Sequence, residues 1–401
     1  MKKILLFGAG KIGRSFIGQL FSRGGYEVIF VDINRELIKS LNDKIYYNVL
    51  IKSDVGDETL LIKNIRGILL SDHEAIYNEL MDVSYVATAV GNENLKEVIP
   101  VIAEGIKRRL AKGKHLPADI IIAENLRNAS AFFKEQLEKY IPADSIRTYI
   151  GLVETSIGKM VPIMTHAEME KDITQVFAEP YNTLILDKKG FKNKLPDIRG
   201  LAPKENMAAW VDRKSFIHNL GHATAAYSGF IKYPERPFMY EVLADEEISS
   251  FTRDTMLQSG SILQELYPGE FSDSDISEHI DDLISRFRNR SLGDTVFRVG
   301  MDLYRKLGRD DRLAGAIHQA LDLNMPYSNI LKALVYGMHF RAKDENGQLF
   351  PRDFRFSELL DQSGIDHILE NICGFDPVIH SDVFTLSKNY NIEVLSRLNK
   401  N

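Results

Sequence analysis

The start of the chain contains the feature that most constrains its fold. The apolar run at residues 3–7 is followed by GAGKIG at residues 8–13, which matches the pattern GxGxxG. Residues 12–23 then show helical spacing, and residues 26–31 form a second apolar run. Because the glycines follow a predicted strand and open a predicted helix that leads to a second strand, this segment predicts a dinucleotide-binding βαβ unit.

Each glycine has a separate role in such a unit, and an acid follows at the expected place. Gly8 would make the tight turn, Gly10 would let the backbone approach a pyrophosphate, and Gly13 would allow close helix–strand packing. Asp32 ends the second apolar run, where a carboxylate accepts hydrogen bonds from the adenosine ribose and repels a 2′-phosphate. The pattern therefore favours NAD over NADP, although Arg35 leaves NADP open. The alternative is a glycine-rich turn of an unrelated protein, with Asp32 capping a loop.

The next part of the chain continues the strand–helix alternation. Short apolar runs at residues 81–90 and 119–123 flank a stretch with helical spacing at residues 95–112. Strands that alternate with helices predict a parallel sheet covered on both faces. Residues 46–65 alternate apolar and polar side chains in part, which predicts an antiparallel excursion. We therefore expect a doubly wound, Rossmann-type α/β domain over residues 1–190.

A basic segment with glycine and proline, residues 187–200, marks the predicted domain boundary. Beyond it the patterns are long and helical, so residues 191–401 are predicted to form a mostly α-helical substrate domain. The predicted helices cover residues 207–230, 240–267, 274–289, 302–323 and 328–341.

Composition excludes several classes of protein. The chain has 50 Lys+Arg against 56 Asp+Glu, a net charge of -6, so it lacks the basic excess of a general nucleic-acid binder. One cysteine, Cys373, excludes an internal disulfide and a cysteine-rich metal site. No run approaches the roughly 20 apolar residues of a membrane span, and the apolar start lacks a signal-peptide cleavage pattern. We expect a cytoplasmic protein with no membrane or nucleic-acid partner.

A second constellation lies at residues 214–222, KSFIHNLGH. At about 100° per residue, Lys214, His218 and His222 share one helical stripe, and Asn219 lies roughly 140° from Lys214. A desolvated lysine can act as a base near neutral pH, and an amide and an imidazole beside it can hold a substrate oxygen. Oxidation of a secondary alcohol with NAD requires this set of groups.

Two alternatives remain for the same residues. His218 and His222 have the i, i+4 spacing of a metal-binding pair, but no glutamate lies between them and no acidic third ligand is near in sequence. We therefore expect no metal. Lys214 could instead be a solvated lysine beside two ordinary, partly buried histidines.

The sequence resembles the polyol-specific long-chain dehydrogenase/reductase family. The family signature K-x4-N-x2-H corresponds to Lys214, Asn219 and His222. The segments FGAGKIGRSFIGQLF, FVDIN, IIAENLRN, RKLGRDDRL and YGMHFR also resemble family segments, so the resemblance extends to about Arg341. It implies a Rossmann domain with a helical domain, metal-independent hydride transfer with NAD, and a monomer.

The resemblance also implies roles for single residues. Lys214 would be the general acid/base, and Asn125 and Asn219 would stabilise the substrate oxygen. His222 would orient substrate hydroxyls. His339 and Arg341 would reach the substrate from the helical domain, unless they form a solvated helix end.

One family segment departs from its usual pattern. Where the family commonly has D-R-[IV]-[VT]-P, this chain has GKMVP at residues 158–162, so an acid is missing and Lys159 stands in place of an arginine. If that acid binds a sugar hydroxyl, either Glu154 replaces it or the substrate differs.

The resemblance implies interconversion of a sugar alcohol phosphate and a ketose phosphate, namely mannitol 1-phosphate and fructose 6-phosphate, and this is the function that we expect. The alternatives are a non-phosphorylated polyol or a hexonate as substrate, and a dinucleotide-binding sensor without catalysis. Arg298, Arg305 and Arg312, spaced by seven residues, would share a face on one unbroken helix and could bind a phosphate. The alternative that we favour is three arginines in separate ion pairs.

Overall fold

The chain forms two compact units in the computed structural model, which describes residues 2–162 and 164–399. Unit 1 ends at Val211 and unit 2 begins at Asp212. The basic segment 187–200 that marks the predicted boundary connects two paired strands of unit 1, β10 and β11, so unit 1 continues beyond it.

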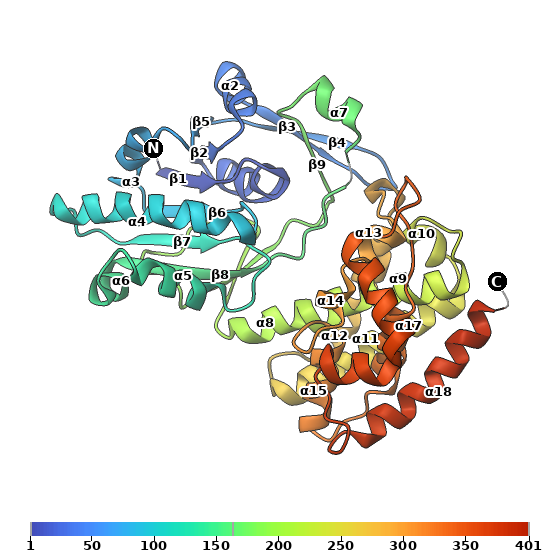
Figure 1. Cartoon of the computed structure of the whole chain (residues 1–401). Helices are drawn as coiled ribbons and strands as arrows, with labels where there is room; N and C mark the ends of the chain where they lie inside the picture. Colours follow the sequence, from blue (N-terminus) through green and yellow to red (C-terminus); the bar gives the residue numbers. More distant parts are fainter. Residues whose placement is uncertain (1, 163, 400–401) are drawn as a thin grey trace. The chain divides into compact units, whose positions relative to one another are not determined.

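Unit 1 is built on an eight-stranded sheet (Figure 1). In order across the sheet, the strands are β11 (Leu201–Lys204), β10 (Leu184–Asp187), β8 (Ile150–Ser156), β7 (Ala118–Ile122), β6 (Tyr85–Thr88), β1 (Lys2–Phe7), β2 (Tyr26–Asp32) and β5 (Ile65–Leu69). The six strands from β8 to β5 are parallel, and β10 runs antiparallel to β8. The chain reverses its direction of winding at β1, as in doubly wound dinucleotide-binding domains, which confirms the predicted fold class.

Helices cover both faces of this sheet because its strands are apolar on both faces. Along β1, Ile4 and Leu6 join one buried core and Leu5 and Phe7 join another. The helical elements of unit 1 are η1 (Gly13–Gly18), α1 (Gln19–Arg23), α2 (Arg35–Lys44), α3 (His73–Leu80), η2 (Asn92–Asn94), α4 (Leu95–Ala111), α5 (Ala129–Glu138), α6 (Ala143–Tyr149) and α7 (His166–Lys171). The next helix, α8 (Met207–Arg213), crosses from unit 1 into unit 2. The first core contains η1, α1 and α2, and the second contains α3, α4 and α5.

A second, three-stranded sheet belongs to the same unit. Its strands are β4 (Glu58–Ile62), β3 (Tyr47–Ile51) and β9 (Val176–Ala178). β3 and β4 pair antiparallel, which confirms the excursion predicted for residues 46–65. β9 adds to β3 in parallel and brings a distant segment against the first helix.

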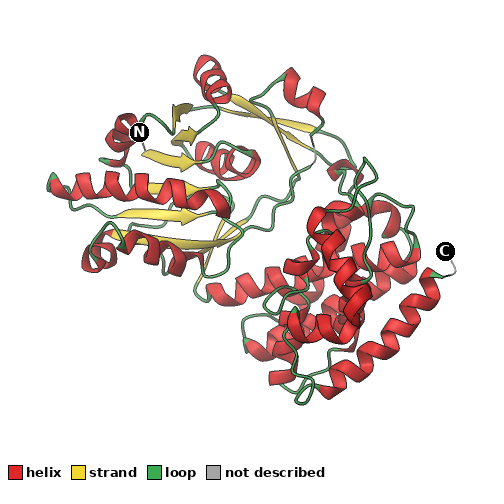
Figure 2. Ribbon diagram, viewed as in Figure 1, coloured by secondary structure: helices red, strands yellow, loops and turns green. Residues whose placement is uncertain are grey.

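Unit 2 is built of helices and loops (Figure 2). Its helical elements are η3 (Lys214–Asn219), α9 (Leu220–Lys232), α10 (Met239–Val242), α11 (Glu246–Leu266), α12 (Asp273–Phe287), η4 (Arg290–Leu292), α13 (Val296–Gly300), α14 (Leu303–Lys306), α15 (Ala314–Asp322), α16 (Ser328–Met338), α17 (Pro351–Asn371) and α18 (Ser381–Leu398). None of the described helices combines the length and the apolar character that a membrane crossing needs.

The helix predicted for residues 302–323 is wrong. α14 and α15 are separated by a turn, in which Gly308 N–H donates to the Arg305 carbonyl and Asp311 N–H to the Gly308 carbonyl. Glycine and aspartate favour such turns over a continuous helix. The apolar spacing is interrupted at the same place, because residues 308–312 (GRDDR) contain no apolar side chain.

Candidate functional site

The glycine loop connects β1 to η1, as the sequence predicts. Gly8 has a φ of 98°, and a Cβ there would lie 2.3 Å from the Ala89 carbonyl oxygen. A Cβ on Gly13 would lie 2.0 Å from the Gly8 carbonyl oxygen. By contrast, a Cβ on Gly10 would meet nothing within 4 Å. The protein itself therefore requires Gly8 and Gly13, whereas the bare backbone at Gly10 fits a ligand that approaches the loop closely.

This contrast predicts different results for two alanine variants. Gly13→Ala is expected to lower the free energy of unfolding by about 1–3 kcal/mol or more, since the new methyl meets backbone atoms. Gly10→Ala is expected to fold with at least the original stability and to weaken NADH binding by about tenfold or more. Denaturant unfolding and NADH fluorescence titration measure the two effects. Wild-type NADH affinity in Gly10→Ala would refute a pyrophosphate at this loop.

Asp32 is joined directly to the glycine loop. Its Oδ2 accepts a hydrogen bond from Ala9 N–H at 2.7 Å, and its Oδ1 accepts one from Asn34 N–H at 2.9 Å. The carboxylate is therefore held in place at the end of β2, where a dinucleotide-binding domain contacts the ribose. Arg35, the first residue of α2, is exposed.

Arg14 is a residue of this site that sequence reasoning missed. Its Nε donates to the Ala9 carbonyl at 2.7 Å, and its Nη1 donates to the Ile173 carbonyl at 2.7 Å. The Tyr47 hydroxyl donates to the Arg14 carbonyl at 2.7 Å. Burial lowers the pKa of Arg14 to about 10, against the opposing effect of nearby Tyr47 and acidic groups. The buried guanidinium of Arg14, which is still positively charged at neutral pH, thus connects the glycine loop to the segment that contains Ile173.

Two buried or partly buried carboxylates lie near the ends of neighbouring strands, Glu124 just after β7 and Glu154 on β8. Glu124 accepts hydrogen bonds from Val90 N–H and Gly91 N–H, both at 2.9 Å, and burial raises its pKa. Glu154 accepts from Ala129 N–H at 3.2 Å and from the Ser130 hydroxyl at 3.3 Å, and burial raises its pKa as well. The Glu154 carboxylate is therefore hydrogen-bonded to the start of α5. This arrangement does not favour Glu154 as a replacement for the acid that is missing from residues 158–162.

Asn125 lies in the loop after β7. Asn125 is exposed, and its backbone carbonyl oxygen accepts a hydrogen bond from Asn92 Nδ2 at 3.0 Å. It belongs to unit 1, and its role in stabilising the substrate oxygen stays a prediction.

The unusual segment at residues 158–162 has a structural explanation at Lys159. This side chain is buried, and its Nζ donates to the Tyr181 carbonyl at 2.8 Å and to Asn182 Oδ1 at 2.9 Å. It also lies 5.2 Å from the centre of the Phe16 ring. Lys159 therefore anchors the segment before β10 to the first helix.

A π-helical turn positions the residues of the signature in unit 2. The turn spans Lys214–Asn219, and Leu220 N–H donates to the Ser215 carbonyl, a hydrogen bond from i+5 to i. In such a turn residue i+5 lies about one turn above residue i. Asn219 is residue i+5 of Lys214, so it lies closer to the lysine's face than the 140° of an ideal α-helix. Turns of this kind are frequent at functional sites.

Lys214 is half-buried among charged neighbours. Burial and the positive charge of Arg312 together lower its pKa to about 8, against the opposing effect of Asp311. Arg312 Nε lies 2.8 Å from Asp311 Oδ1, and its Nη1 donates to the Asn219 carbonyl at 3.3 Å. A lysine with this pKa can both accept and release a proton near neutral pH.

His222 is held by an aromatic ring but leaves a nitrogen unused. Its ring stacks on Phe287, with the centroids 4.3 Å apart and an angle of 3° between the planes. Its Nε2 is buried, lies 3.7 Å from Asp294 Oδ2 and makes no hydrogen bond within the described residues. Burial and nearby positive groups lower the pKa of His222 well below its usual value. A neutral imidazole with an unused nitrogen suits a substrate hydroxyl.

His218 lies one turn earlier and is buried. Its ring centroid is 5.5 Å from that of Phe287 and 6.3 Å from that of His222. Within residues 2–162 and 164–399, no group of three or more His, Cys, Asp or Glu side chains is placed to hold a metal ion.

The arginines spaced by seven residues lie on separate elements, each beside an acid. Arg298 on α13 pairs with Asp294, Arg305 on α14 with Asp302, and Arg312 before α15 with Asp311. Arg305 Nη1 also lies 3.5 Å from Asp311 Oδ2, so Arg305 and Arg312 share one carboxylate, and Arg312 is buried. The arginines are therefore ion-paired, as the favoured alternative expects, but not in three separate pairs.

His339 and Arg341 follow α16. His339 Nε2 lies 2.6 Å from Asn391 Oδ1, and Arg341 Nη1 donates to the carbonyls of Met338 and Phe340 at 2.9 and 2.8 Å. Within the described chain, Arg341 has no carboxylate within 4.0 Å, although it is partly buried and burial lowers its pKa. It therefore differs from the three paired arginines.

Comparison with known proteins gives a match over nearly the whole chain. The mannitol dehydrogenase Rossmann domain matches residues 2–200, and the mannitol dehydrogenase C-terminal domain matches residues 206–384. The chain belongs to the mannitol dehydrogenase family. The predicted dehydrogenase class is therefore confirmed, and the family's Rossmann domain agrees with the predicted cofactor, NAD.

Curated relatives and a solved structure add detail. The chain is 29% identical to the mannitol-1-phosphate 5-dehydrogenase of Streptococcus mutans, over 96% of this chain and 98% of that protein. It is 30% identical to the enzyme of the same name from Buchnera aphidicola, over 97% and 98%. The structure of Pseudomonas fluorescens mannitol 2-dehydrogenase, a ternary complex with NAD and D-mannitol, aligns with a TM-score of 0.77 at 17% identity and covers 100% of this chain and 94% of that one. This last likeness concerns the fold.

Several residues of this family member lay beyond sequence reasoning. Asp294 and Phe287 reach His222 from later parts of the chain, and no local pattern links them to it. The turn RKLGRDDRL, which contains Arg312 and Asp311, was noted only as a family segment and as part of an arginine series. Its contact with Asn219 depends on the tertiary fold.

Proposed function

We propose that the chain is an NAD-dependent dehydrogenase that interconverts mannitol 1-phosphate and fructose 6-phosphate, with Lys214 as the acid/base. The observation that carries the chemistry is Lys214, with its lowered pKa, on a π-turn shared with Asn219. The substrate is supported by the two curated relatives, which match over nearly their full length.

The residues of unit 2 supply the proton chemistry. When the alcohol is oxidised, neutral Lys214 Nζ accepts the hydroxyl proton, and in the reverse direction its ammonium returns that proton to the oxygen. The Asn219 amide donates a hydrogen bond to the oxygen as charge develops on it. The unused His222 Nε2 contacts a neighbouring hydroxyl and fixes the carbon chain. Bound NAD supplies the acceptor for the hydride, and Gly10 and Asp32 would hold it.

A non-phosphorylated polyol is the second candidate. The observation that favours it is the pairing of Arg298, Arg305 and Arg312 with acids, which leaves them less suited to a phosphate. Arg341 favours the phosphorylated substrate, because within the described chain no carboxylate pairs with it directly, although Asp361 and Asp353 act on it from farther away. Reduction of fructose 6-phosphate and of fructose with NADH tests the two candidates. A far higher kcat/KM for the phosphate supports the proposal, and equal values refute it.

The cofactor preference gives a further prediction. Asp32→Ser is expected to narrow the ratio of kcat/KM with NAD to that with NADP, because the negative charge that repels a 2′-phosphate is removed. Glu36→Gln removes a charge from the first turn of α2 nearby and is the matched control, with an unchanged ratio expected. A wild-type enzyme that uses NADP as well as NAD would contradict the role of Asp32.

A further inference from the structure

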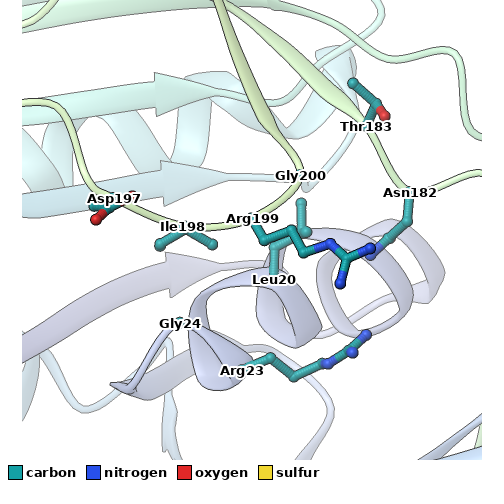
Figure 3. A pocket seen from close by; sticks show the side chains of 9 residues that line it. All are labelled: Leu20, Arg23, Gly24, Asn182, Thr183, Asp197, Ile198, Arg199 and Gly200. Carbon is teal, nitrogen blue, oxygen red and sulfur yellow. The ribbon is translucent and has the colours of Figure 1, made fainter.

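A pocket in unit 1 lies at the end of the first helix opposite to the glycine loop. It is lined by the last turn of α1 and by segments just before β10 and β11, and its volume is about 740 Å³ (Figure 3). This volume suits a small metabolite. The proposed function uses none of the residues that line it.

Two arginines in this pocket have no partner in the described chain. Arg23 and Arg199 are exposed, and neither makes an ion pair or a hydrogen bond with the residues that the structure describes. Three other arginines of unit 1 are engaged, since Arg66 pairs with Glu27, Arg108 with Glu74, and Arg147 with Asp144. Figure 3 shows the side chains of Arg23 and Arg199 extending toward the side of the pocket where Asn182 lies. The guanidinium groups of Arg23 and Arg199 thus both line one pocket.

The amide of Asn182 is oriented by buried groups. Its Oδ1 accepts hydrogen bonds from Gln19 Nε2 at 2.8 Å and from Lys159 Nζ at 2.9 Å. Gln19 and Lys159 are both buried, so the amide is fixed with its oxygen turned to them. Its NH₂ group is then left to donate to a ligand, as is the hydroxyl of Thr183, which also lines the pocket.

We propose that this pocket binds a small phosphate-bearing anion, held by the guanidinium groups of Arg23 and Arg199 and by the amide of Asn182. Guanidinium groups bind phosphate oxygens through paired hydrogen bonds, which suits two arginines that share a site. Asp197 is the acidic residue of the lining, and Figure 3 shows it at the side away from Asn182. The pocket is larger than a phosphate ion, so an ester with a polar carbon skeleton fits it better than the free ion.

Calorimetric titration of the full chain tests this proposal. Glucose 6-phosphate and inorganic phosphate are titrated separately at constant ionic strength, with glucose as the uncharged control. We expect one binding event with glucose 6-phosphate that weakens at least about tenfold in Arg23→Gln and in Arg199→Gln and is lost in the double variant. Arg355→Gln, which removes an exposed arginine of α17, is the matched control and is expected to keep the event.

The outcomes distinguish a phosphate ester from inorganic phosphate as the ligand, and binding in this pocket from binding at the proposed substrate site. Tighter binding of the ester than of the free ion supports the proposal in full, and equal binding of both supports the anion site with inorganic phosphate as its ligand. Arg23→Lys keeps the charge and is expected to retain part of the affinity. Unchanged melting temperatures without ligand show that the variants fold. A glucose 6-phosphate isotherm identical in the wild type and the double variant overturns the proposal, whatever the substrate of the enzyme is.

Discussion

Replacing Lys214 with alanine is expected to lower kcat by about 10²-fold or more, because general acid–base catalysis contributes that much. NADH binding should persist, since Gly10 and Asp32 belong to unit 1. Steady-state reduction of fructose 6-phosphate and NADH fluorescence measure the two quantities. Lys343→Ala removes an exposed lysine and is the matched control, with kcat unchanged. A near-normal kcat in Lys214→Ala would end the assignment.

The pH dependence provides an independent check of the same residue. Burial and Arg312 lower the pKa of Lys214 to about 8. Oxidation needs the neutral amine, so its kcat/KM should rise as the pH increases through about 8. Reduction needs the ammonium form, so its kcat/KM should fall over the same interval. In Lys214→Ala both inflections should vanish, and primary amines added to the buffer should restore part of the rate.

Much of the fold could be predicted because its signals are local. The glycine loop, the two flanking strands and Asp32 lie within one short segment, and each glycine has its own steric reason. The antiparallel excursion was visible as an alternation of residue types. The continuation of unit 1 through β10 and β11 was not, because short strands at a sheet edge have little periodicity. The turn between α14 and α15 does have a local signal, because residues 308–312 (GRDDR) contain no apolar side chain, and the predicted helix of residues 302–323 ignores it.

Sequence patterns indicate the candidate site residues that share one helix, but not those that tertiary contacts bring beside them. Lys214, Asn219 and His222 form a sequence signature, but the angle between Lys214 and Asn219 depends on a π-turn that α-helical spacing cannot indicate. No sequence pattern singles out Arg14. Its function in holding the Ala9 carbonyl follows only from its burial between the loop and Ile173. The same holds for Asp294 beside His222.

Arg341 decides between the two candidate substrates. Its Nη1 is used by the carbonyls of Met338 and Phe340, which leaves other guanidinium hydrogens to donate. Burial lowers its pKa, against the opposing charges of Asp361 and Asp353, and the group stays positive. A phosphate dianion would add a direct counter-charge, whereas a neutral polyol would not. We therefore expect the guanidinium to contribute to the binding of the phosphorylated substrate and not to that of fructose.

Arg341→Ala is expected to raise KM for fructose 6-phosphate and to leave kcat/KM for fructose nearly unchanged. Loss of a buried guanidinium–phosphate contact costs about 2–5 kcal/mol, which corresponds to a decrease in kcat/KM of about 30-fold or more. Arg341→Lys should recover part of it, because the charge is kept but the paired hydrogen bonds are lost. Arg305→Ala, which removes an arginine paired with Asp302 and Asp311, tests the alternative position of the phosphate. The melting temperature is measured as well: an unchanged value shows that substrate binding is lost, whereas a lowered value shows that the end of α16 is destabilised. The ratio of kcat/KM for fructose 6-phosphate to that for fructose could instead be unchanged in Arg341→Ala and lowered in Arg305→Ala. That result would place the phosphate at the paired arginines and leave Arg341 with a role only at the end of α16.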